Sequence, residues 1–469
     1  MRIFVKFLIN FFIFVFLNIF YFNVCFATDL SSSPSLPNLT NLPFNIHSFQ
    51  TPEGLSVQFV HEDSIPIVVF ELGFRAGSSY DRDQWGLADL VAKSIGQETD
   101  TESGDQLAVD LDNSGAEITS AVDRDLSIFT MRSQVQPALL NPAVSTLVQL
   151  ISQMATSDKV LAHVKQNQIQ KIQIDSTQPL EIAENALMAN LFSGTSYAHS
   201  VHGNLTSVNT IGEGDLMNFY HQYYVDKNAD LVIVGDISLA QAQNIASQFS
   251  SALPSGQKAV IPALNSLFNP PISINSNNST SSNSSNIHIA FPSKQTVILM
   301  GQRSLSKTDP LNLALLTGLT VLAGPTMESV LYNNLRVDQG LVYDISSDAN
   351  TWSGAGEISI LAQADNINAQ AVESEINQAI GSLTQSGPAQ GDLAHARSYL
   401  AGSFQLGFSS DKNLADMLLT LMAYGFPENY LNQRAQDLLS LAPSDISQAF
   451  SHIAQNNNPW VTITVGGDA

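Results

Sequence analysis

Both halves of this 469-residue chain close on the same pattern, and this repeat constrains the fold more than any other feature of the sequence. Asp215–Tyr220 predicts a helix, and the apolar run from Asn228 to Asp236 predicts a strand that ends in Gly and Asp. Asp445–Phe450 and the run from Asn458 to Asp468 repeat this order, and the spacing from the first Asp to the Gly differs by one residue. A duplicated α+β unit is the simplest account, and a chance likeness of two helix–strand endings is the alternative.

A low-complexity tract separates the two copies. Residues 276–286 consist only of Ser, Asn and Thr, so this segment cannot bury apolar surface, and a Pro-containing stretch precedes it. A chain of this length is expected to hold at least two domains. We therefore predict one domain over residues 44–251, a linker over 252–287 and a second domain over 288–469.

The N-terminus has the pattern of a secretory signal peptide. Two cationic residues precede an apolar run from Phe7 to Val24, and Cys25-Phe26-Ala27 offers a cleavage site after the alanine. We predict a signal peptide over residues 1–27 and a flexible leader over 28–43. The alternatives are an uncleaved membrane anchor, because the apolar run could span a bilayer, and lipoprotein processing at Cys25, which its large preceding residues disfavour. Export and the Asn/Ser-rich composition indicate a bacterial periplasm.

The charge and the cysteine content narrow the function further. Asp and Glu number 42 against 19 Lys and Arg, which gives a formal net charge of −23. This acidity argues against binding nucleic acid or anionic membranes and is compatible with cationic peptide partners. Cys25 is the only cysteine, so a chain cleaved after Ala27 has no disulfide, no thiolate metal ligand and no cysteine nucleophile.

Hydrophobic periodicity predicts the elements of the first half. Strands are expected over residues 66–74, 116–122 and 126–132, the last two as an antiparallel pair, and helices over 84–95, 106–111, 142–155 and 160–174.

Several short stretches resemble the pitrilysin/insulinase-type metallopeptidases. They are Phe74–Asp81 with Gly86–Lys93, then Phe192–Tyr197 with Gly203, and Leu331–Tyr343 in the second half. The resemblance covers nearly all of the chain after the leader. It implies an α+β fold of two homologous α/β-roll domains that form half of a clamp.

In that family, the Gly-Leu-Ala helix carries H-x-x-E-H, in which two histidines bind zinc and the glutamate acts as general base, and a distant glutamate completes the site. The alignment on Gly86 places Asp89, Ala92 and Lys93 at the three helix positions, and the distant glutamate falls at Gln170 to Gln173. A protonated lysine cannot bind zinc and an alanine cannot transfer a proton. We therefore predict that this chain holds no zinc and binds no cofactor of its own.

The altered helix has two interpretations. Asp89 and Lys93 are spaced i, i+4 with the acid first, so they could form an exposed ion pair worth about 0.2–0.5 kcal/mol. Alternatively, the Lys93 cation occupies the place where the family holds zinc. His199 and His202 have no carboxylate near them in the sequence, so we interpret them as surface or packing residues rather than metal ligands.

The second-half motif is intact. In family members that cleave peptides, an arginine and a tyrosine from the C-terminal domain reach the central chamber, and the matching residues are Arg336 and Tyr343. Arginine can donate to a peptide carbonyl, and a tyrosine hydroxyl can donate to a developing oxyanion. A helix-end arginine and a half-buried strand tyrosine are the structural alternative.

These facts leave two hypotheses of function. The first is the non-metal subunit of a heterodimeric zinc endopeptidase: it is no metallopeptidase alone, its partner is a homologue with H-x-x-E-H that holds the zinc, and its substrate is a peptide or an unfolded polypeptide. The second is a structural or chaperone-like, peptide-binding member of the family, in which Arg336 and Tyr343 are relics.

Overall fold

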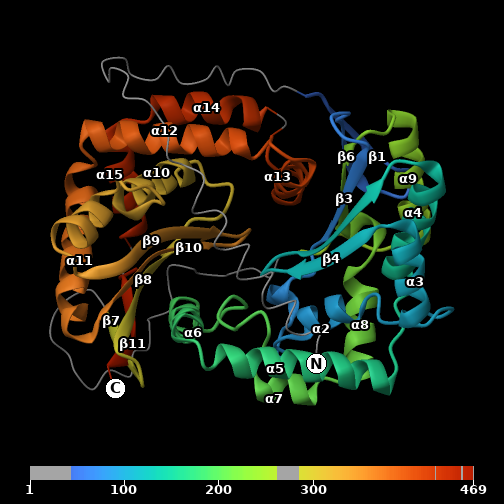
Figure 1. Cartoon of the computed structure of the whole chain (residues 1–469), viewed down its shortest axis with the longest axis horizontal. Helices are drawn as coiled ribbons and strands as arrows, with labels where there is room; N and C mark the ends of the chain where they lie inside the picture. Colours follow the sequence, from blue (N-terminus) through green and yellow to red (C-terminus); the bar gives the residue numbers. More distant parts are fainter. Residues whose placement is uncertain (1–43, 261–284, 428, 456–457, 468–469) are drawn as a thin grey trace. The chain divides into compact units, whose positions relative to one another are not determined.

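The computed structural model describes residues 44–260, 285–427, 429–455 and 458–467 (Figure 1). The predicted signal peptide, the leader and most of the predicted linker lie outside these ranges, so they stay predictions. Within the described ranges, no helix is both long enough and apolar enough to cross a membrane.

Two mixed sheets form the framework, one in each half of the chain (Figure 1). The first has the order β1-β2-β6-β3-β5-β4, with strands β1 Ile46–Gln50, β2 Ser56–His61, β3 Ile67–Phe74, β4 Glu117–Val122, β5 Ser127–Gln134 and β6 Ala229–Gly235. The second has the order β7-β11-β8-β10-β9, with strands β7 Ser285–Phe291, β8 Gln295–Ser304, β9 Val342–Thr351, β10 Gly356–Asp365 and β11 Val461–Gly467.

The sheets repeat one topology. In each, the last strand of the half (β6 or β11) pairs parallel with the first strand of the repeat (β2 or β7) and antiparallel with the second (β3 or β8). The prediction of duplicated α/β units is therefore confirmed.

The repeat extends to single hydrogen bonds. Asn228 Nδ2 donates to the carbonyl oxygens of Tyr223 at 2.7 Å and Arg75 at 3.1 Å. Asn458 Nδ2 donates to those of Ile453 at 2.7 Å and Arg303 at 2.9 Å. Each asparagine thus ties the end of a helix to the end of a central strand, which explains why both copies carry Asn at this point.

Helices cover both faces of both sheets. Those of the first half are α2 Leu87–Ser94, α3 Gly104–Ser114, α4 Pro137–Ser152, α5 Asp158–Asp175, α6 Pro179–Leu191, α7 Leu205–Thr210, α8 Glu213–Tyr223 and α9 Leu239–Ala252, with short 3₁₀ turns at Ser78–Tyr80 and Asp226–Asn228. Those of the second half are α10 Asn312–Ala323, α11 Ala369–Ser386, α12 Gln390–Leu406, α13 Asp411–Tyr424, α14 Tyr430–Ser440 and α15 Pro443–Ile453, with a π-helix, η3, at Tyr332–Asp338 and a 3₁₀ turn at Asn366–Asn368.

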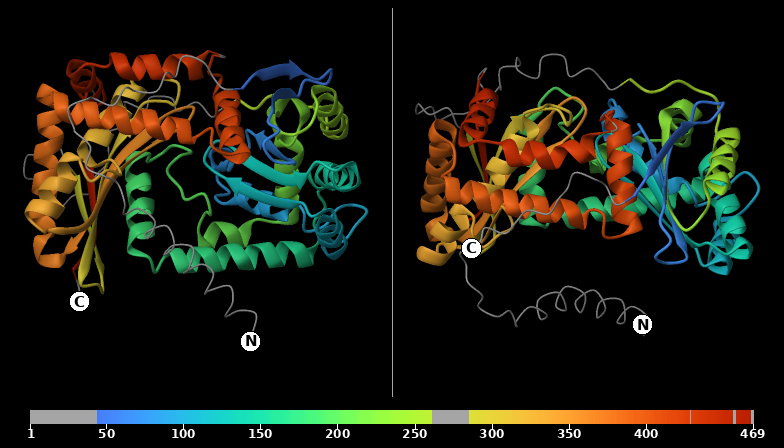
Figure 2. Two further views of the ribbon diagram at one scale, coloured as in Figure 1. Left: turned by 45° about the horizontal axis from the view of Figure 1, so that its top comes forward. Right: turned by 90° about the horizontal axis from the view of Figure 1, so that it is seen from above.

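The two halves exchange a helix. Helix α13 of the second half packs on β3 and β6 of the first sheet, and helix α6 of the first half packs on β8 and β11 of the second (Figures 1 and 2). Each contact needs a glycine in the central strand, because a Cβ at Gly73 would lie 2.9 Å from Leu419 and one at Gly301 would lie 2.5 Å from Leu187. The exchange gives each sheet a second buried face, and α13 and α6 thereby join the halves through apolar contacts.

The strands and helices predicted for the first half are all present, with shifted ends. Helix α2 begins at Leu87 rather than near residue 84, because Gly86 has a left-handed backbone with φ +93° that ends the preceding loop. Helix α4 begins at Pro137, five residues before the predicted start, and contains Pro142 within it. Strands β4 and β5 form the predicted antiparallel pair.

Candidate functional site

The loop that leads into α2 is fixed by a buried acid. Asp81 accepts hydrogen bonds from the backbone N–H groups of Gly86 at 2.7 Å and Ala88 at 2.8 Å, which satisfies donors at the start of the helix. Burial raises the pKa of Asp81, while these hydrogen bonds oppose the rise. The helix that corresponds to the family's zinc helix is thus held firmly in place.

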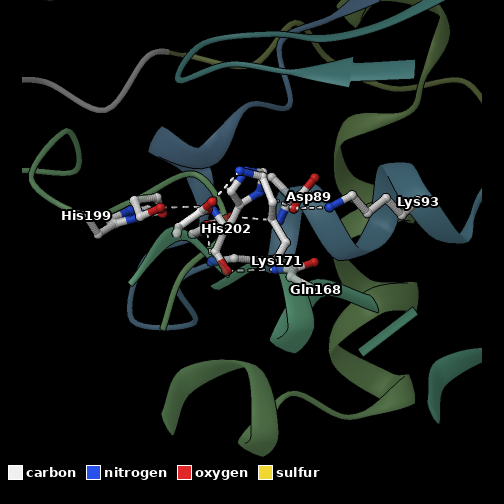
Figure 3. A network of polar contacts seen from close by, with 11 residues as sticks. Asp89, Lys93, Gln168, Lys171, His199 and His202 are labelled. Atoms are coloured by element: carbon white, nitrogen blue, oxygen red, sulfur yellow. Dashed lines mark hydrogen bonds and ion pairs between the residues drawn. The ribbon is translucent and has the colours of Figure 1, made fainter. Parts of the chain in front are cut away.

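Asp89 is the centre of a small polar network on α2 (Figure 3). Its side chain is only 6% exposed, and one of its oxygens, Oδ2, contacts both Lys93 Nζ and His202 Nδ1 at 2.7 Å. The Lys93 side chain is 36% exposed and that of His202 is 28% exposed. The predicted Asp89–Lys93 pair is therefore present, but its acid is buried and shared with a histidine rather than solvated.

This network does not fit a zinc ion. The family's first ligand position holds the carboxylate of Asp89, which already binds a cation and an imidazole, and the third position holds the cation itself. Ala92, at the general-base position, is buried and has no polar group. Among the described residues, no three or more His, Cys, Asp or Glu side chains are grouped so that they could hold a metal.

Helix α5 runs beside α2 and offers no acid to it. Gln170, at the predicted place of the distant glutamate, is exposed, and the residue that contacts the start of α2 is Gln168. Gln168 Nε2 donates to the carbonyl oxygens of Gly86 at 3.0 Å and His202 at 2.9 Å. The nearest acid along α5, Asp175, pairs instead with Lys171 at 2.5 Å.

The two histidines differ in their surroundings. His199 is buried, its ring stacks on that of Trp85 with centroids 5.4 Å apart, and burial lowers its pKa. This fits the interpretation of a packing residue. His202 instead binds Asp89 across 113 positions of sequence, a contact that sequence reasoning missed because nothing in the local pattern links the two residues.

Sequence reasoning also missed a buried network that joins the halves. Asp125, in the turn between β4 and β5, accepts hydrogen bonds from Tyr197 Oη and from the backbone N–H of Ser353, both at 2.7 Å. Arg124 lies over the ring of Trp352 at 5.3 Å and donates to the carbonyl oxygen of His199. These contacts place the β9–β10 turn of the second half against the loop that carries both histidines.

Arg336 and Tyr343 lie on the surface of the second half. Arg336 is exposed in η3, with its guanidinium carbon 5.7 Å from the centre of the Tyr332 ring. Tyr343 lies on β9, an edge strand, and is 50% exposed. Its hydroxyl donates to Asp365 Oδ1 at 2.9 Å, and this hydrogen bond raises the pKa of the tyrosine. Both functional groups are therefore accessible to another molecule.

The fold and the altered α2 together define a class: an insulinase-type peptidase architecture whose zinc-ligand positions carry other residues. Two family models match the chain, one described as Insulinase (Peptidase family M16) over residues 57–204 and one as Peptidase M16 inactive domain over residues 210–400. The chain belongs to this family.

Sequence relatives lie at low identity but match over most of their length. An "uncharacterized zinc protease" of Rickettsia bellii is 19% identical over 364 residues, which cover 77% of this chain and 83% of that protein. One of Bacillus subtilis is 18% identical over 366 residues, which cover 78% of this chain and 85% of that protein.

Solved structures share the fold over nearly the whole chain. A peptidase M16 inactive domain from Pseudomonas fluorescens superposes with a TM-score of 0.82 at 24% identity, covering 91% of this chain and 99% of that one. A protease from Helicobacter pylori superposes with a TM-score of 0.78 at 14% identity, covering 90% and 99%.

Proposed function

We propose that this chain is the non-metal subunit of a heterodimeric zinc endopeptidase and that it works in the bacterial periplasm. The observation that carries the proposal is the contrast between the two family motifs. The α2 positions hold an Asp89–Lys93–His202 network that does not fit zinc, whereas Arg336 and Tyr343 are retained and accessible.

In this role, the zinc belongs to a homologous partner that carries H-x-x-E-H. This chain supplies the Arg336 guanidinium, which can donate to a substrate carbonyl, and the Tyr343 hydroxyl, which can donate to an oxyanion once it exchanges Asp365 for the substrate. The substrate is an unfolded or short peptide. The formal charge of −23 favours cationic peptides over anionic ones.

A structural or peptide-binding role without catalysis is the second candidate. It is supported by the same network, because an ion pair with a buried acid maintains α2 whether or not a partner exists. The two candidates differ in what they require of Arg336 and Tyr343, which a purely structural role leaves unused.

The experiment that separates them is co-purification with an H-x-x-E-H homologue encoded in the same genome, followed by peptide cleavage by each protein alone and by the mixture. We expect cleavage at full rate only in the mixture. If the homologue alone cleaves at the rate of the mixture, this chain is no catalytic subunit and the structural role holds.

A further inference from the structure

A large cavity lies in the second half, away from both family motifs. Its volume is about 1020 Å³, and its walls come mainly from α10, α13, α14 and the loop between β8 and α10. Sites for small molecules commonly measure roughly 300–1,000 Å³, so this cavity can hold a sizeable ligand. The apolar part of the wall includes Leu313, Leu316, Phe404, Met417, Leu421 and Tyr430.

One cation in the wall, Arg434, is held by a hydroxyl group and two aromatic rings rather than by a carboxylate. Arg434 Nη1 donates to the hydroxyl of Tyr430 at 2.6 Å, and the guanidinium carbon lies 5.7 Å from the ring of Phe404 and 5.8 Å from that of Tyr430. Arg434 forms no ion pair with any acid in the part of the chain that the structure describes. A guanidinium held in this way presents its remaining N–H groups to a planar anion.

A second cation contributes to the same wall. The Lys307 ammonium lies 4.9 Å from the centre of the Tyr424 ring, and it has no carboxylate within ion-pair distance among the described residues. Burial lowers the pKa of this lysine, although Asp123 and Asp125 oppose the shift from a greater distance. An anion in the cavity would therefore be attracted by two cations that have no carboxylate within ion-pair distance among the described residues.

The acids of the wall are already engaged or lie at its rim. Asp309 accepts a hydrogen bond from the backbone N–H of Leu311 at 2.9 Å, and Asp416 pairs with Lys412, which also binds Glu71 of the first sheet. Asp437 is exposed. The wall thus combines apolar side chains with the cations Lys307 and Arg434, while its carboxylates are engaged elsewhere or exposed, a combination that suits an amphipathic anion better than a cation or a neutral sugar.

We propose that this cavity binds a long-chain carboxylate. The alkyl chain lies against Leu313, Leu316 and Met417, and the carboxylate accepts hydrogen bonds from Arg434. The proposal is independent of the proposed function, because it uses neither α2 nor the Arg336–Tyr343 region.

A ligand in the cavity would also contact the helix that joins the two halves. Helix α13 packs Leu414 and Leu418 against the first sheet, while Asn413, Met417 and Thr420 of the same helix line the cavity. A ligand that binds the native state stabilises it by mass action, so saturating ligand should raise the melting temperature.

The test uses the purified chain without its predicted signal peptide, cis-parinaric acid as fluorescent probe and palmitate as competitor. We expect saturable binding of one probe per chain and full displacement by palmitate. Methyl palmitate and palmitoyl-lysophosphatidylcholine should compete at least tenfold more weakly, because neither presents a free carboxylate to Arg434.

Variants locate the site. Arg434→Gln should weaken palmitate binding about tenfold or more, because glutamine cannot supply the charged hydrogen bonds that the carboxylate accepts from arginine. Arg132→Gln, at an exposed arginine of β5 outside the cavity, is the matched control and should bind as the wild type does. Thr420→Trp, or Leu316→Trp if the first variant fails to fold, should obstruct part of the cavity and weaken binding with the circular dichroism spectrum unchanged.

Three results would overturn the proposal. They are no saturable binding by the wild-type chain, equal affinities of Arg434→Gln and Arg132→Gln, and undiminished binding by folded cavity-filling variants. Equal affinity for palmitate and the lysolipid would be a fourth such result, because it would show that an acyl chain binds without recognition of its carboxylate by Arg434.

Discussion

The two family motifs differ in this molecule: the residues of the zinc motif on α2 are replaced, whereas the arginine and tyrosine of the second-half motif are retained. At α2 the catalytic residues are replaced, yet the replacements are packed: Asp89 is buried and binds both Lys93 and His202. In the η3–β9 region, Arg336 and Tyr343 are kept, yet they are exposed: Arg336 lies near the Tyr332 ring and Tyr343 donates to Asp365. The difference teaches that α2 now serves the fold, whereas Arg336 and Tyr343 contribute little to it and are free to serve another molecule.

The largest effect we expect is on catalysis by the η3–β9 region. Arg336→Ala or Tyr343→Phe, each mixed with the H-x-x-E-H partner, should lower kcat/KM for peptide cleavage about 100-fold, the order of effect of losing one oxyanion donor. Asp338→Ala, a change at an exposed acid of the same η3 segment, is the control and should leave the rate near that of wild type. Unchanged rates in both variants would remove Arg336 and Tyr343 from any catalytic role.

The second effect concerns stability at α2. Asp89→Ala leaves Lys93 and His202 without their shared acceptor, so we expect the free energy of unfolding in urea to fall by about 1–3 kcal/mol. Asp338→Ala should change it by less than about 0.5 kcal/mol. Equal, small losses in both variants would mean that the buried network contributes nothing to the fold.

The third effect is a pH dependence of the stability of the second sheet. On β10, next to β9, burial raises the pKa of Glu357 from 4.5 to about 7, although a hydrogen bond from Asn350 at 2.8 Å opposes the rise. The native state therefore binds this proton more tightly than the unfolded chain does. Its stabilising contribution is complete below about pH 4.5 and is lost as the pH rises through about 7.

Glu357→Gln removes this dependence. We expect the wild type to lose about 1–3 kcal/mol more than the variant between pH 5 and pH 8, measured by urea unfolding at both values. Glu117→Gln, at an exposed position on β4, is the control and should follow the wild type. Parallel curves for wild type and Glu357→Gln would show that this carboxyl titrates as it does in the unfolded chain.

The smallest effect sharpens the contrast between the regions. Arg336→Ala and Tyr343→Phe should each change the free energy of unfolding by less than about 0.5 kcal/mol, because exposed side chains with single contacts contribute little to stability. A loss above 1 kcal/mol in either variant would give that residue a structural role and weaken the comparison.

The sequence predicts the repeated unit well because its signals are local. The Asn–strand–Gly ending recurs in both halves, and Asn228 and Asn458 make equivalent bonds. The exchange of α6 and α13 could not be predicted, since an apolar helix face does not specify which sheet it covers. In the sequence, each contact is marked by a glycine two residues before an arginine, Gly73 in β3 and Gly301 in β8. The structure explains these glycines, because a Cβ at either position would collide with Leu419 or Leu187 of the exchanged helix.

The candidate site shows the same limit. The loss of the zinc-motif residues at Asp89, Ala92 and Lys93 can be predicted from the sequence, because all three positions are counted from Gly86 along one helix. The contact between Asp89 and His202 depends on how distant segments pack. The same holds for Gln168, which contacts the start of α2 where we predicted Gln170. Such contacts carry no signal in a single sequence.

The most direct test of the central claim is made on the isolated chain. The purified protein, incubated with excess zinc and then freed of unbound metal by gel filtration, is measured for bound zinc by mass spectrometry and for peptide cleavage with and without a chelator. We predict no stoichiometric zinc and no chelator-sensitive cleavage until the H-x-x-E-H partner is added. One tightly bound zinc per chain, with cleavage that the chelator abolishes, would contradict the account.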